Sequence, residues 1–226
     1  MTQIKHAINE EYKSEVFLMD CMEGMKQYPD KYFDLACVDV PYGIDMDGGK
    51  IGGNNLGEAK DYIKKSWDKE APDTAYFKEL CRVSKNQIIW GANHFIANIP
   101  NANSSCWIVW DKDNTGNFAD CELAWASFKT TVRKVKIRWN GMLQQNMKEK
   151  EMRIHPTQKP VQLYDWIFKN YASEGQKILD THLGSQSSRI SANKNKLHFT
   201  GFELDPDYFR DGNKRYEDHV SQLTLF

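Results

Sequence analysis

The run Leu-Ala-Cys-Val at residues 35–38 contains no polar residue and leads into Asp39-Val40-Pro41-Tyr42-Gly43. An apolar run without alternation is typical of a strand buried on both faces, as in a parallel sheet covered by helices on both sides. In doubly wound sheets, ligands bind beyond the carboxyl ends of such strands. The run therefore predicts a helix-covered sheet and makes residues 39–43 a candidate site.

The rest of the chain alternates strand-like and helical patterns. Further strand-like runs fall at residues 16–19, 87–90, 107–110, 122–128, 135–139, 177–179 and 198–202, and helical patterns at residues 75–83, 161–171, 187–193 and 208–220. Strands that alternate with helices predict a mainly parallel sheet, whereas the closely spaced strands from 107 to 139 predict an antiparallel portion. We expect an α/β fold with a small β-rich insertion, in a single domain over residues 1–226.

Composition limits the functional classes. The formal net charge is −1, so any affinity for nucleic acid has to come from a local basic patch. The five cysteines are odd in number and include no Cys-x-x-Cys pair, so we expect reduced thiols and no metal site. No apolar stretch is long enough for a signal core or a membrane span, which predicts a soluble cytoplasmic protein without a membrane partner.

Residues 43–65 differ from their surroundings. Glycines are frequent there among polar residues, and no periodicity is present. A loop this long in a compact domain is either functional or disordered. Because it directly follows the candidate site, we expect residues 44–65 to form a mobile loop that covers this site.

A second candidate site lies at residues 177–192. A buried strand, an acid, a tight loop with Gly184 and a helix follow one another there, as where a bare backbone approaches a nucleotide-like ligand. Glu203 ends the next strand at about the twenty-residue offset of a ribose-binding acid. A carboxylate can accept hydrogen bonds from both ribose hydroxyls. The alternative for Glu203 is a solvated strand-end acid, and Asp205 fits the N-cap of the last helix.

The segment His-Pro-Thr-Gln-Lys-Pro at residues 155–160 is a third candidate. Its two prolines give an extended entry to a helix that starts near Val161. Thr157 and Lys159 would present a hydroxyl and a cation, which suit a carboxylate. The alternative is a proline-stiffened helix start with an exposed lysine, and His155 alone indicates no function.

Together these segments resemble the amino-group DNA methyltransferases of the β class, which use S-adenosylmethionine. In that class a D-P-P-Y segment comes first, recognition residues follow, and H-P-[ST]-[QE]-K-P and D-P-F-x-G-[ST]-G segments come last. Here DVPYG at 39, HPTQKP at 155, DTHLGSQSS at 180 and GFELD at 201 occur in that order. The segments CMEGMKQYPDKYFDLACVD, SWDKE and QIIWGANHF look like the compact phage and prophage members. The resemblance covers almost the whole chain and implies a Rossmann-like methyltransferase fold.

The resemblance also implies a reaction and a catalytic site. A methyl group would pass to the exocyclic amino group of adenine, or less often cytosine, in a base flipped out of duplex DNA. Asp39 and the backbone carbonyl of Val40 would accept hydrogen bonds from this amino group. Pro41 would direct the backbone, and Tyr42 would stack on the base. Val40 replaces the first proline of the family segment but keeps the carbonyl.

A set of cofactor contacts follows from the same resemblance. They are Asp20 and Cys21 at the adenine ring of S-adenosylmethionine, Thr157 and Lys159 at its carboxylate, Asp180, His182, Gly184 and Ser185 on the methionine side, and Glu203 at the ribose. Gln186 stands where the family usually has a second loop glycine. We expect its side chain to crowd the cofactor or to require a disfavoured backbone angle, and so to lower affinity.

The local basic patch lies at residues 129–153, where only Glu149 and Glu151 oppose the basic residues. Interleaved with Trp139 and Asn140, the segment fits a small target-recognition region that contacts phosphates and a few base edges of DNA. An ordinary solvated hairpin is the alternative. Its basic residues are Lys129, Arg133, Lys134, Lys136, Arg138, Lys148, Lys150 and Arg153.

Residues 221–226 form a candidate C-terminal tail. Gln222, Leu223, Thr224, Leu225 and Phe226 resemble the Q-L-[SD]-L-F peptide by which bacterial replication proteins bind the sliding clamp. An extended tail of this kind fills apolar pockets on a partner, while the glutamine sets its register. Alternatively, the apolar side chains fold back on the protein's own core.

We therefore expect a DNA adenine methyltransferase of the compact phage or prophage type in a bacterial cytoplasm. The choice of adenine follows from family frequency alone. Two other functions stay open: a non-catalytic, clamp-associated DNA-binding relative, and an RNA methyltransferase of related permuted design.

Overall fold

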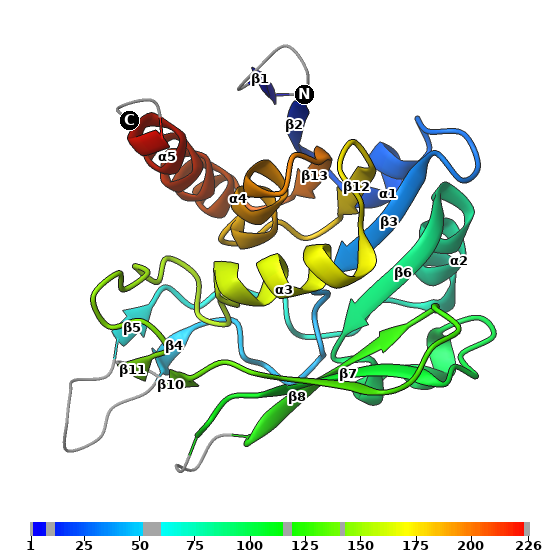
Figure 1. The fold of residues 1–226 in the computed structure, drawn as a ribbon, viewed down its shortest axis with the longest axis horizontal. Helices are drawn as coiled ribbons and strands as arrows, with labels where there is room; N and C mark the ends of the chain where they lie inside the picture. Colours follow the sequence, from blue (N-terminus) through cyan, green and yellow to red (C-terminus); the bar gives the residue numbers. More distant parts are fainter. Residues whose placement is uncertain (1, 8–11, 52–59, 115–118, 141–142, 224–226) are drawn as a thin grey trace.

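The computed structural model describes residues 2–7, 12–51, 60–114, 119–140 and 143–223 (Figure 1). Its strands are β1 (Thr2–Ala7), β2 (Lys13–Leu18), β3 (Phe33–Val38), β4 (Gly49–Ile51), β5 (Lys60–Tyr62), β6 (Ser84–Trp90), β7 (Cys106–Asp111), β8 (Cys121–Ala126), β9 (Arg133–Lys136), β10 (Trp139–Asn140), β11 (Leu143–Gln144), β12 (Lys177–Asp180) and β13 (His198–Glu203). Its helices are α1 (Cys21–Met25), α2 (Thr74–Val83), the short 3-10 helices η1 (Ala92–His94) and η2 (Ile96–Asn98), α3 (Val161–Tyr171), α4 (Ser187–Lys194) and α5 (Pro206–Leu223).

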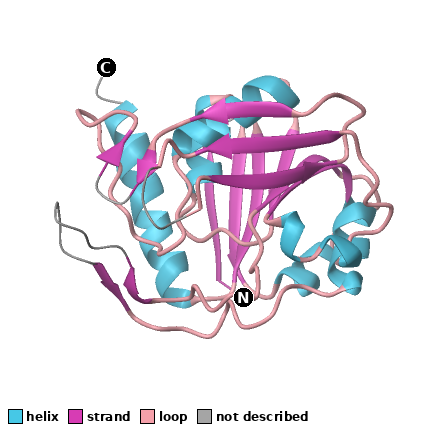
Figure 2. Cartoon of the chain, turned by 90° about the horizontal axis from the view of Figure 1, so that it is seen from below, coloured by secondary structure: helices cyan, strands magenta, loops and turns pink. Residues whose placement is uncertain are grey.

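Among the described residues, nine strands form one sheet in the order β1-β2-β13-β12-β3-β6-β8-β7-β9. The part from β2 to β6 is parallel throughout. β8 is antiparallel to both β6 and β7, and β9 is parallel to β7 at the edge. Figure 2 shows the strands between helices on either side.

Burial on both faces explains why the central strands lack alternation. Adjacent residues of a strand face opposite sides of the sheet. In β3, Leu35 and Cys37 pack in one core cluster with apolar side chains of α3. Ala36 and Val38 pack in a second cluster, on the other face, with apolar side chains of α2. Each face of β3 therefore needs apolar residues, and the run 35–38 is continuous.

The predicted α/β architecture, with a parallel centre and an antiparallel portion, is confirmed. The strand predicted at residues 135–139 differs, because β9 ends at Lys136, lies parallel to β7, and is followed by the separate hairpin of β10 and β11. β9 is an edge strand with three of its four residues exposed and basic. Charged residues on an edge strand discourage pairing with other chains. They also leave β9 without the apolar pattern from which a strand is predicted.

The segment predicted as a loop at residues 44–65 contains the antiparallel hairpin of β4 and β5. Residues 52–59 of that segment lie outside the described residues. The sequence pattern did not predict this hairpin because each strand has only three residues. In the described part of the chain, no helix has both the length and the apolar character that crossing a membrane requires.

The parallel strands bring the predicted site residues to one edge of the sheet. Asp20 follows β2, Asp39 follows β3, Asp180 ends β12 and Glu203 ends β13. These four strands are neighbours and run in the same direction. Their carboxyl ends therefore meet, although the residues come from distant parts of the chain.

Candidate functional site

A cavity of about 2240 Å³ opens at this edge of the sheet. A pocket for one small ligand usually measures about 300 to 1,000 Å³, so this cavity has room for two ligands. Most residues predicted for the two candidate sites line it, namely Asp20, Cys21, Asp39, Val40, Pro41, Tyr42, Thr157, Lys159, His182, Gly184, Ser185 and Glu203. Among the described residues, no group of three or more His, Cys, Asp or Glu could hold a metal ion.

Asp68 organises the turn that follows β3. Its Oδ1 accepts hydrogen bonds from the backbone N–H groups of Tyr42 (2.7 Å) and Gly43 (3.0 Å). Its Oδ2 accepts one from the N–H of Met46 (2.8 Å), and the side chain is buried. Hydrogen bonds from N–H groups to a carboxylate are among the stronger ones in proteins. The turn is therefore well ordered, with the side chains of Asp39 and Tyr42 in the cavity wall.

Asp39 belongs to a chain of four charged side chains. Lys159 Nζ donates a hydrogen bond to Asp39 Oδ1 (2.5 Å) and lies 3.1 Å from Glu122 Oε2. Glu122, on β8, also forms an ion pair with Lys112, which follows β7. The Lys159 side chain is only 3% exposed. The sequence predicted Lys159 beside Thr157 as part of a carboxylate site; here its ammonium lies between two of the chain's own carboxylates instead.

These neighbours set the ionisation of the site. Burial raises the pKa of Asp39, although the charge of Lys159 acts in the opposite direction. Burial also opposes ionisation of Glu122, but Lys159 and Lys112 outweigh it and hold the pKa of Glu122 at about 2. For Lys159, the two carboxylates outweigh burial and raise its pKa. Glu122 is therefore negative and Lys159 positive over the physiological pH range.

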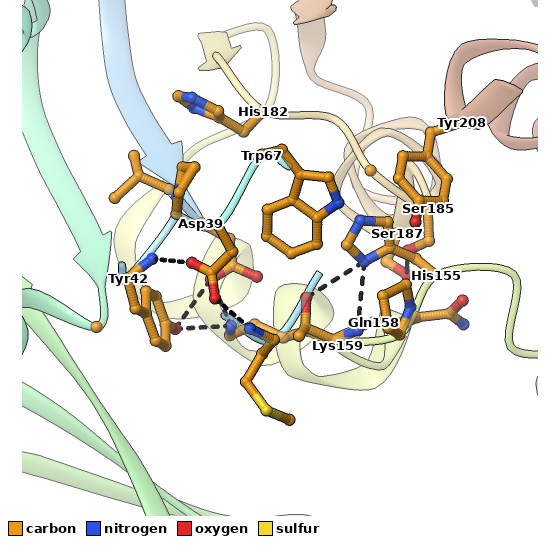
Figure 3. Close-up of a pocket in the computed structure, with 18 of the residues that line it drawn as sticks. Asp39, Tyr42, Trp67, His155, Gln158, Lys159, His182, Ser185, Ser187 and Tyr208 are labelled. Atoms are coloured by element: carbon orange, nitrogen blue, oxygen red, sulfur yellow. Dashed lines mark hydrogen bonds and ion pairs between the residues drawn. The ribbon is translucent and has the colours of Figure 1, made fainter. Parts of the chain in front are cut away.

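The Tyr42 ring forms part of the cavity wall beside Asp39 (Figure 3). Its hydroxyl donates to Asp39 Oδ1 (3.0 Å), and its ring stacks with His94 at a centroid distance of 5.2 Å and an interplanar angle of 17°. Gly91, with φ of 68°, packs against the same ring, where a Cβ would lie 2.1 Å from Tyr42 Cε1. Only glycine at position 91 lets the Tyr42 ring lie here.

Glu203 holds the glycine loop in place. Its Oε2 accepts a hydrogen bond from the N–H of Gly184 (2.8 Å), and its Oε1 accepts one each from Leu204 and Asp205 (2.9 Å). Gly184 has φ of 48°, a left-handed conformation that suits glycine. Glu203 and the bare backbone at Gly184 thus face the cavity together, as the sequence predicted.

Asp180 takes a different place from the one predicted. Its side chain is buried and is absent from the cavity wall. Its Oδ1 accepts a hydrogen bond from the N–H of His182 (3.1 Å), and its Oδ2 accepts one from the hydroxyl of Ser188 (2.5 Å). Burial raises the pKa of Asp180 to about 7. Asp180 therefore shapes the loop between β12 and α4 rather than facing a ligand.

Asp20 and Cys21 lie at the start of α1, in the cavity wall. Asp20 caps this helix, because its Oδ1 accepts hydrogen bonds from the N–H groups of Met22 (2.9 Å) and Glu23 (3.2 Å). Burial raises the pKa of the Cys21 thiol to about 12, and the charge of Asp20 adds to this. The thiol stays protonated, so a role for Cys21 would fall on its backbone.

An aromatic group lines the other side of the cavity (Figure 3). The ring of His155 lies 5.1 Å from Trp67 and 4.3 Å from Tyr208, measured between ring centroids. Burial lowers the pKa of His155 to about 3, so the ring is neutral. Its Nδ1 accepts a hydrogen bond from the N–H of Thr157 (3.3 Å). His155 is therefore an aromatic surface and a support for Thr157.

Lys65 connects the segment after β5 to the other side of the cavity. Its Nζ lies 2.9 Å from Asp205 Oδ2 and 2.8 Å from Asp207 Oδ2, at the start of α5. Asp205 also caps α5, as the sequence predicted, by accepting hydrogen bonds from Asp207 and Tyr208. The end of segment 44–65 thus lies beside the cavity.

Gln186 does not crowd the cavity. Its backbone adopts the expected disfavoured conformation, with φ of 59°. Its side chain, however, is buried away from the cavity, where its Oε1 accepts a hydrogen bond from Arg189 (2.8 Å) and its side chain packs against Gly212 of α5. Arg189 also donates to Asn213 (2.7 Å) in the same buried network. The expectation of crowding was therefore wrong, because the left-handed turn directs this side chain toward α5.

Several basic side chains of segment 129–153 form ion pairs within the protein, which the sequence did not indicate. Lys134 pairs with Asp111 (3.3 Å), and Lys136 (2.7 Å) and Arg138 both pair with Asp113. Asp111 in β7 and Asp113 in the loop after β7 thus neutralise part of the basic patch. Lys129 and Arg133 are exposed.

Trp139 is buried rather than exposed on the surface of the basic segment, and it lines the cavity. It is 6% exposed, and its Nε1 donates a hydrogen bond to the carbonyl of Gln158 (2.8 Å). The guanidinium of Arg153 lies over its ring at 4.7 Å from the centroid. An aromatic residue between lysines has the same appearance in sequence whether it faces solvent or core.

The predicted tail is described only in part. Helix α5 continues to Leu223, so Gln222 and Leu223 are in the last helical turn rather than in an extended segment, and Gln222 is exposed. Thr224, Leu225 and Phe226 lie outside the described residues.

Several residues of the site had no predicted role. Glu122, Lys112 and Tyr164 line the cavity beside Asp39, and Asp68 and Trp67 come from the segment Ser-Trp-Asp-Lys-Glu. The proximity of that segment to the glycine-rich stretch was the available signal for Asp68. Glu122 and Lys112 lie in the antiparallel strands, where nothing local indicates that β8 faces the end of β3.

Comparisons with known proteins agree with the resemblance seen in the sequence. Residues 124–214 match the family model described as DNA methylase. Type II methyltransferase M2.DpnII of Streptococcus pneumoniae is 33% identical over 85 residues, which is 38% of this chain and 31% of that protein. The second match thus spans under a third of the relative's length. Both matches support the predicted resemblance to amino-group DNA methyltransferases over part of this chain.

Solved structures share the fold over most of the chain. The M1.HpyAVI–SAM complex has a TM-score of 0.53 at 18% identity, covering 88% of this chain and 98% of that one. PvuII DNA methyltransferase, cytosine-N4-specific, has a TM-score of 0.57 at 12% identity, covering 92% of each. TTHA0409 of Thermus thermophilus, a putative DNA modification methylase complexed with S-adenosyl-L-methionine, has a TM-score of 0.54 at 12% identity, covering 91% and 93%. The predicted Rossmann-like methyltransferase fold is confirmed.

The network around Gln186 makes a prediction about stability. Replacing Gln186 with Gly removes left-handed strain worth about 1 to 2 kcal/mol. It also removes a buried hydrogen bond to Arg189, where bonds to charged groups contribute about 1.5 to 3 kcal/mol, and it leaves a cavity. We expect Gln186→Gly to lower the free energy of unfolding, as measured by urea denaturation.

Lys196→Gly is the matched control, because Lys196 also has a left-handed φ of 56° but is exposed. We expect its stability to be unchanged or raised. Equal stabilisation by the two variants would contradict the role assigned to Gln186.

Proposed function

We propose, from the match of residues 124–214 to the DNA methylase family, that this chain transfers a methyl group from S-adenosylmethionine to the exocyclic amino group of adenine in duplex DNA. One observation supports this most directly. A hydrogen-bond acceptor with an adjacent aromatic ring, Asp39 and Tyr42, lines the same cavity as the bare loop at Gly184 and the strand-end acid Glu203. The cavity volume suits a flipped base and a nucleoside cofactor together.

The residues on the Glu203 side fit S-adenosylmethionine. Glu203 is a carboxylate at a strand end with Gly184 beside it. The side chain of Gln186, which was expected to crowd the cofactor, is directed away from the cavity. The cofactor would supply a methyl group activated on a sulfonium. Asp20 and Cys21 would contact the adenine ring, Glu203 the ribose, and the remaining contacts would come from Thr157, His182, Gly184 and Ser185.

Asp39 would act on the target amino group. The nitrogen of this group is a poor nucleophile, because its lone pair is delocalised into the ring. Within the described residues, the hydrogen bonds to the Asp39 carboxylate fall on Oδ1, so Oδ2 is available to accept an amino hydrogen. The backbone carbonyl of Val40 would accept the second hydrogen. Two such acceptors favour tetrahedral geometry and orient the lone pair for transfer.

Tyr42 would receive the base once it leaves the duplex. Its ring is in the cavity wall, and stacking of a base on an aromatic side chain contributes about 1 to 3 kcal/mol. This offsets part of the unstacking cost, a few kcal/mol, of flipping the base. The choice of adenine rather than cytosine remains part of the proposal, since PvuII methyltransferase shares the fold and is cytosine-N4-specific.

The proposed activity predicts a methylated base. Unmodified duplex DNA incubated with the protein and S-adenosylmethionine should contain N6-methyladenine, detected by mass spectrometry of its nucleosides. Asp39→Ala should lower the rate by about 10² to 10⁴-fold, the usual contribution of a positioned acid–base group. Asp30→Ala, at an exposed position away from the cavity, should retain the rate.

The outcomes separate the alternatives. Methylcytosine in place of methyladenine would change the base assignment. Preferential methylation of RNA in competition would favour the RNA enzyme. DNA binding without a methylated base would favour the non-catalytic relative and contradict the proposal.

We propose that DNA lies across the mouth of the cavity, with its phosphates near the basic segment. Lys129 and Arg133 stay candidates for these contacts, as do Lys134, Lys136 and Arg138 despite their acidic partners. Lys150 and Lys64 are exposed and line the cavity itself, so we expect them to approach DNA most closely. The described ends of segment 44–65, residues 44–51 and 60–65, contribute side chains to the cavity wall, which supports a covering role for this segment.

Salt dependence tests this footprint. Each phosphate contact that is lost should reduce the slope of log affinity against log salt by about one unit. We expect Lys150→Ala to reduce the slope and Lys136→Ala, whose charge is shared with Asp113, to change it less. Equal slopes for the wild type and Lys150→Ala, measured by fluorescence anisotropy, would exclude Lys150 from the interface.

The C-terminal tail is proposed to bind the bacterial sliding clamp, consistent with a phage- or prophage-encoded enzyme in a bacterial cytoplasm. Exposure of Gln222 in the last turn of α5 supports accessibility, and helix ends unwind at low cost. Removal of residues 222–226 should abolish pull-down by purified clamp without lowering the melting temperature. A fall in melting temperature would instead indicate that the tail packs on the protein's own core.

A further inference from the structure

Glu122 occupies a position that the proposed chemistry leaves unexplained. It lies on β8, in the antiparallel part of the sheet, yet its carboxylate reaches the ammonium of Lys159 beside Asp39. Its side chain is 22% exposed and faces the cavity. A carboxylate so close to a catalytic carboxylate is unfavourable unless cations separate them.

The cations are present, and the signs alternate along the chain. Lys112 pairs with Glu122, Glu122 with Lys159, and Lys159 with Asp39. The four formal charges cancel. Because Glu122 and Asp39 share Lys159, neither carboxylate has the full attraction of that ammonium.

The hydroxyl of Tyr42 connects the same groups. It lies 3.0 Å from Asp39 Oδ1, 3.4 Å from Glu122 Oε2 and 3.0 Å from Lys159 Nζ. Figure 3 shows Asp39, Tyr42 and Lys159 together on one side of the cavity. Lys159 and the Tyr42 hydroxyl thus both approach Oδ1, so their position determines which carboxylate oxygen remains for a substrate.

We propose that Glu122 is a positioning residue for methyl transfer, which acts through Lys159 to keep Asp39 a strong hydrogen-bond acceptor with Oδ2 directed to the target amino group. This rests on the proposed function. Glu122 holds the Lys159 ammonium beside Oδ1 of Asp39 and shares the electrostatic attraction of that ammonium with Asp39. Without Glu122, Lys159 would pair with Asp39 alone and weaken it as an acceptor.

Other ionisable groups around Asp39 do not replace Glu122. Asp180, Cys37 and Tyr164 interact electrostatically with Asp39 from β12, β3 and α3. None of the three forms an ion pair with Lys159 among the described residues. Loss of the Glu122 charge therefore leaves Asp39 as the carboxylate that pairs with Lys159 in the described part of the chain.

The sign of the expected pH effect follows from these charges. The negative charge of Glu122 raises the pKa of Asp39, and Lys159 lowers it. Glu122→Gln keeps the shape, removes the first influence and strengthens the second. The pKa of Asp39 should fall by about one unit or more, within the range for nearby charges. The acidic limb of the activity profile should move to lower pH, and the maximal rate should fall because a less basic acceptor is less effective.

Two measurements test the inference. The first is the pH dependence of kcat and KM for methyl transfer by the wild type, Glu122→Gln and Glu122→Asp. We expect a roughly tenfold lower kcat for Glu122→Gln, an acidic limb at lower pH, an unchanged KM for S-adenosylmethionine, and substantial recovery in Glu122→Asp. The second is the titration of the Asp39 carboxyl carbon by NMR, assigned with Asp39→Asn, which needs no activity.

Glu79→Gln is the matched control. Glu79 is 18% exposed and pairs with Arg82 through a hydrogen bond of 2.7 Å, but it lies outside the cavity. We expect Glu79→Gln to affect stability without moving the acidic limb or the Asp39 titration. A similar pH shift in both variants would show a general effect of lost charge and would overturn the inference.

The two proposals can fail separately. A wild type that methylates no base refutes the proposed function, and the NMR titration still judges the inference. An Asp39 pKa that is the same in the wild type and Glu122→Gln overturns the inference even if the enzyme is active. An altered KM for S-adenosylmethionine with an unmoved acidic limb also overturns it.

Discussion

The parallel pairing of β12 with β3 and β13 determines where the site is built. The register pairs Ile178 with Leu35 and Leu179 with Ala36. It brings the carboxyl ends of strands from the beginning and the end of the chain to one edge of the sheet. The loop that contains Gly184 therefore shares a cavity with the turn that contains Asp39, and neither segment alone would form a ligand site.

Around this edge, buried polar contacts hold the loops. Asp68 binds the backbone after β3, Glu203 binds the backbone at Gly184, and Asp180 binds the start of α4. In each case a carboxylate accepts hydrogen bonds from backbone N–H groups or a hydroxyl of the neighbouring loop. The acids near the cavity thus divide into those that shape loops, such as Asp68 and Asp180, and those available to a ligand, such as Asp39.

Much of this could be predicted from short patterns. The apolar run before Asp39 located a central strand, because burial on both faces removes alternation. The acid at Glu203 and the glycine at 184 located the second half of the cavity, because ligands approach bare backbone at strand ends. Sequence patterns did not predict burial or ion pairing in the basic segment, because a residue looks the same in sequence whether it is exposed, buried or paired. Trp139 is buried, and Lys134, Lys136 and Arg138 have acidic partners from β7 and the loop after it.

Gln186 and Lys159 also show the difference between what a local pattern predicts and what depends on the folded structure. The left-handed angle at Gln186 could be expected, because a tight loop needs it, but the direction of the side chain depends on space beside Gly212 of α5. The position of the Lys159 ammonium depends on its ion pair with Glu122, which reaches Lys159 only because β8 pairs antiparallel with β6.

The sequence by itself determined the α/β architecture, the order of its segments and the residues at the two strand ends, because these follow from local periodicity and from backbone preferences. Tertiary structure alone decided which charges meet and which polar side chains face the cavity. Electrostatic and hydrogen-bonding partners are set by distances in space, and residues such as Asp39, Glu122 and Lys159 come together only when the sheet has formed.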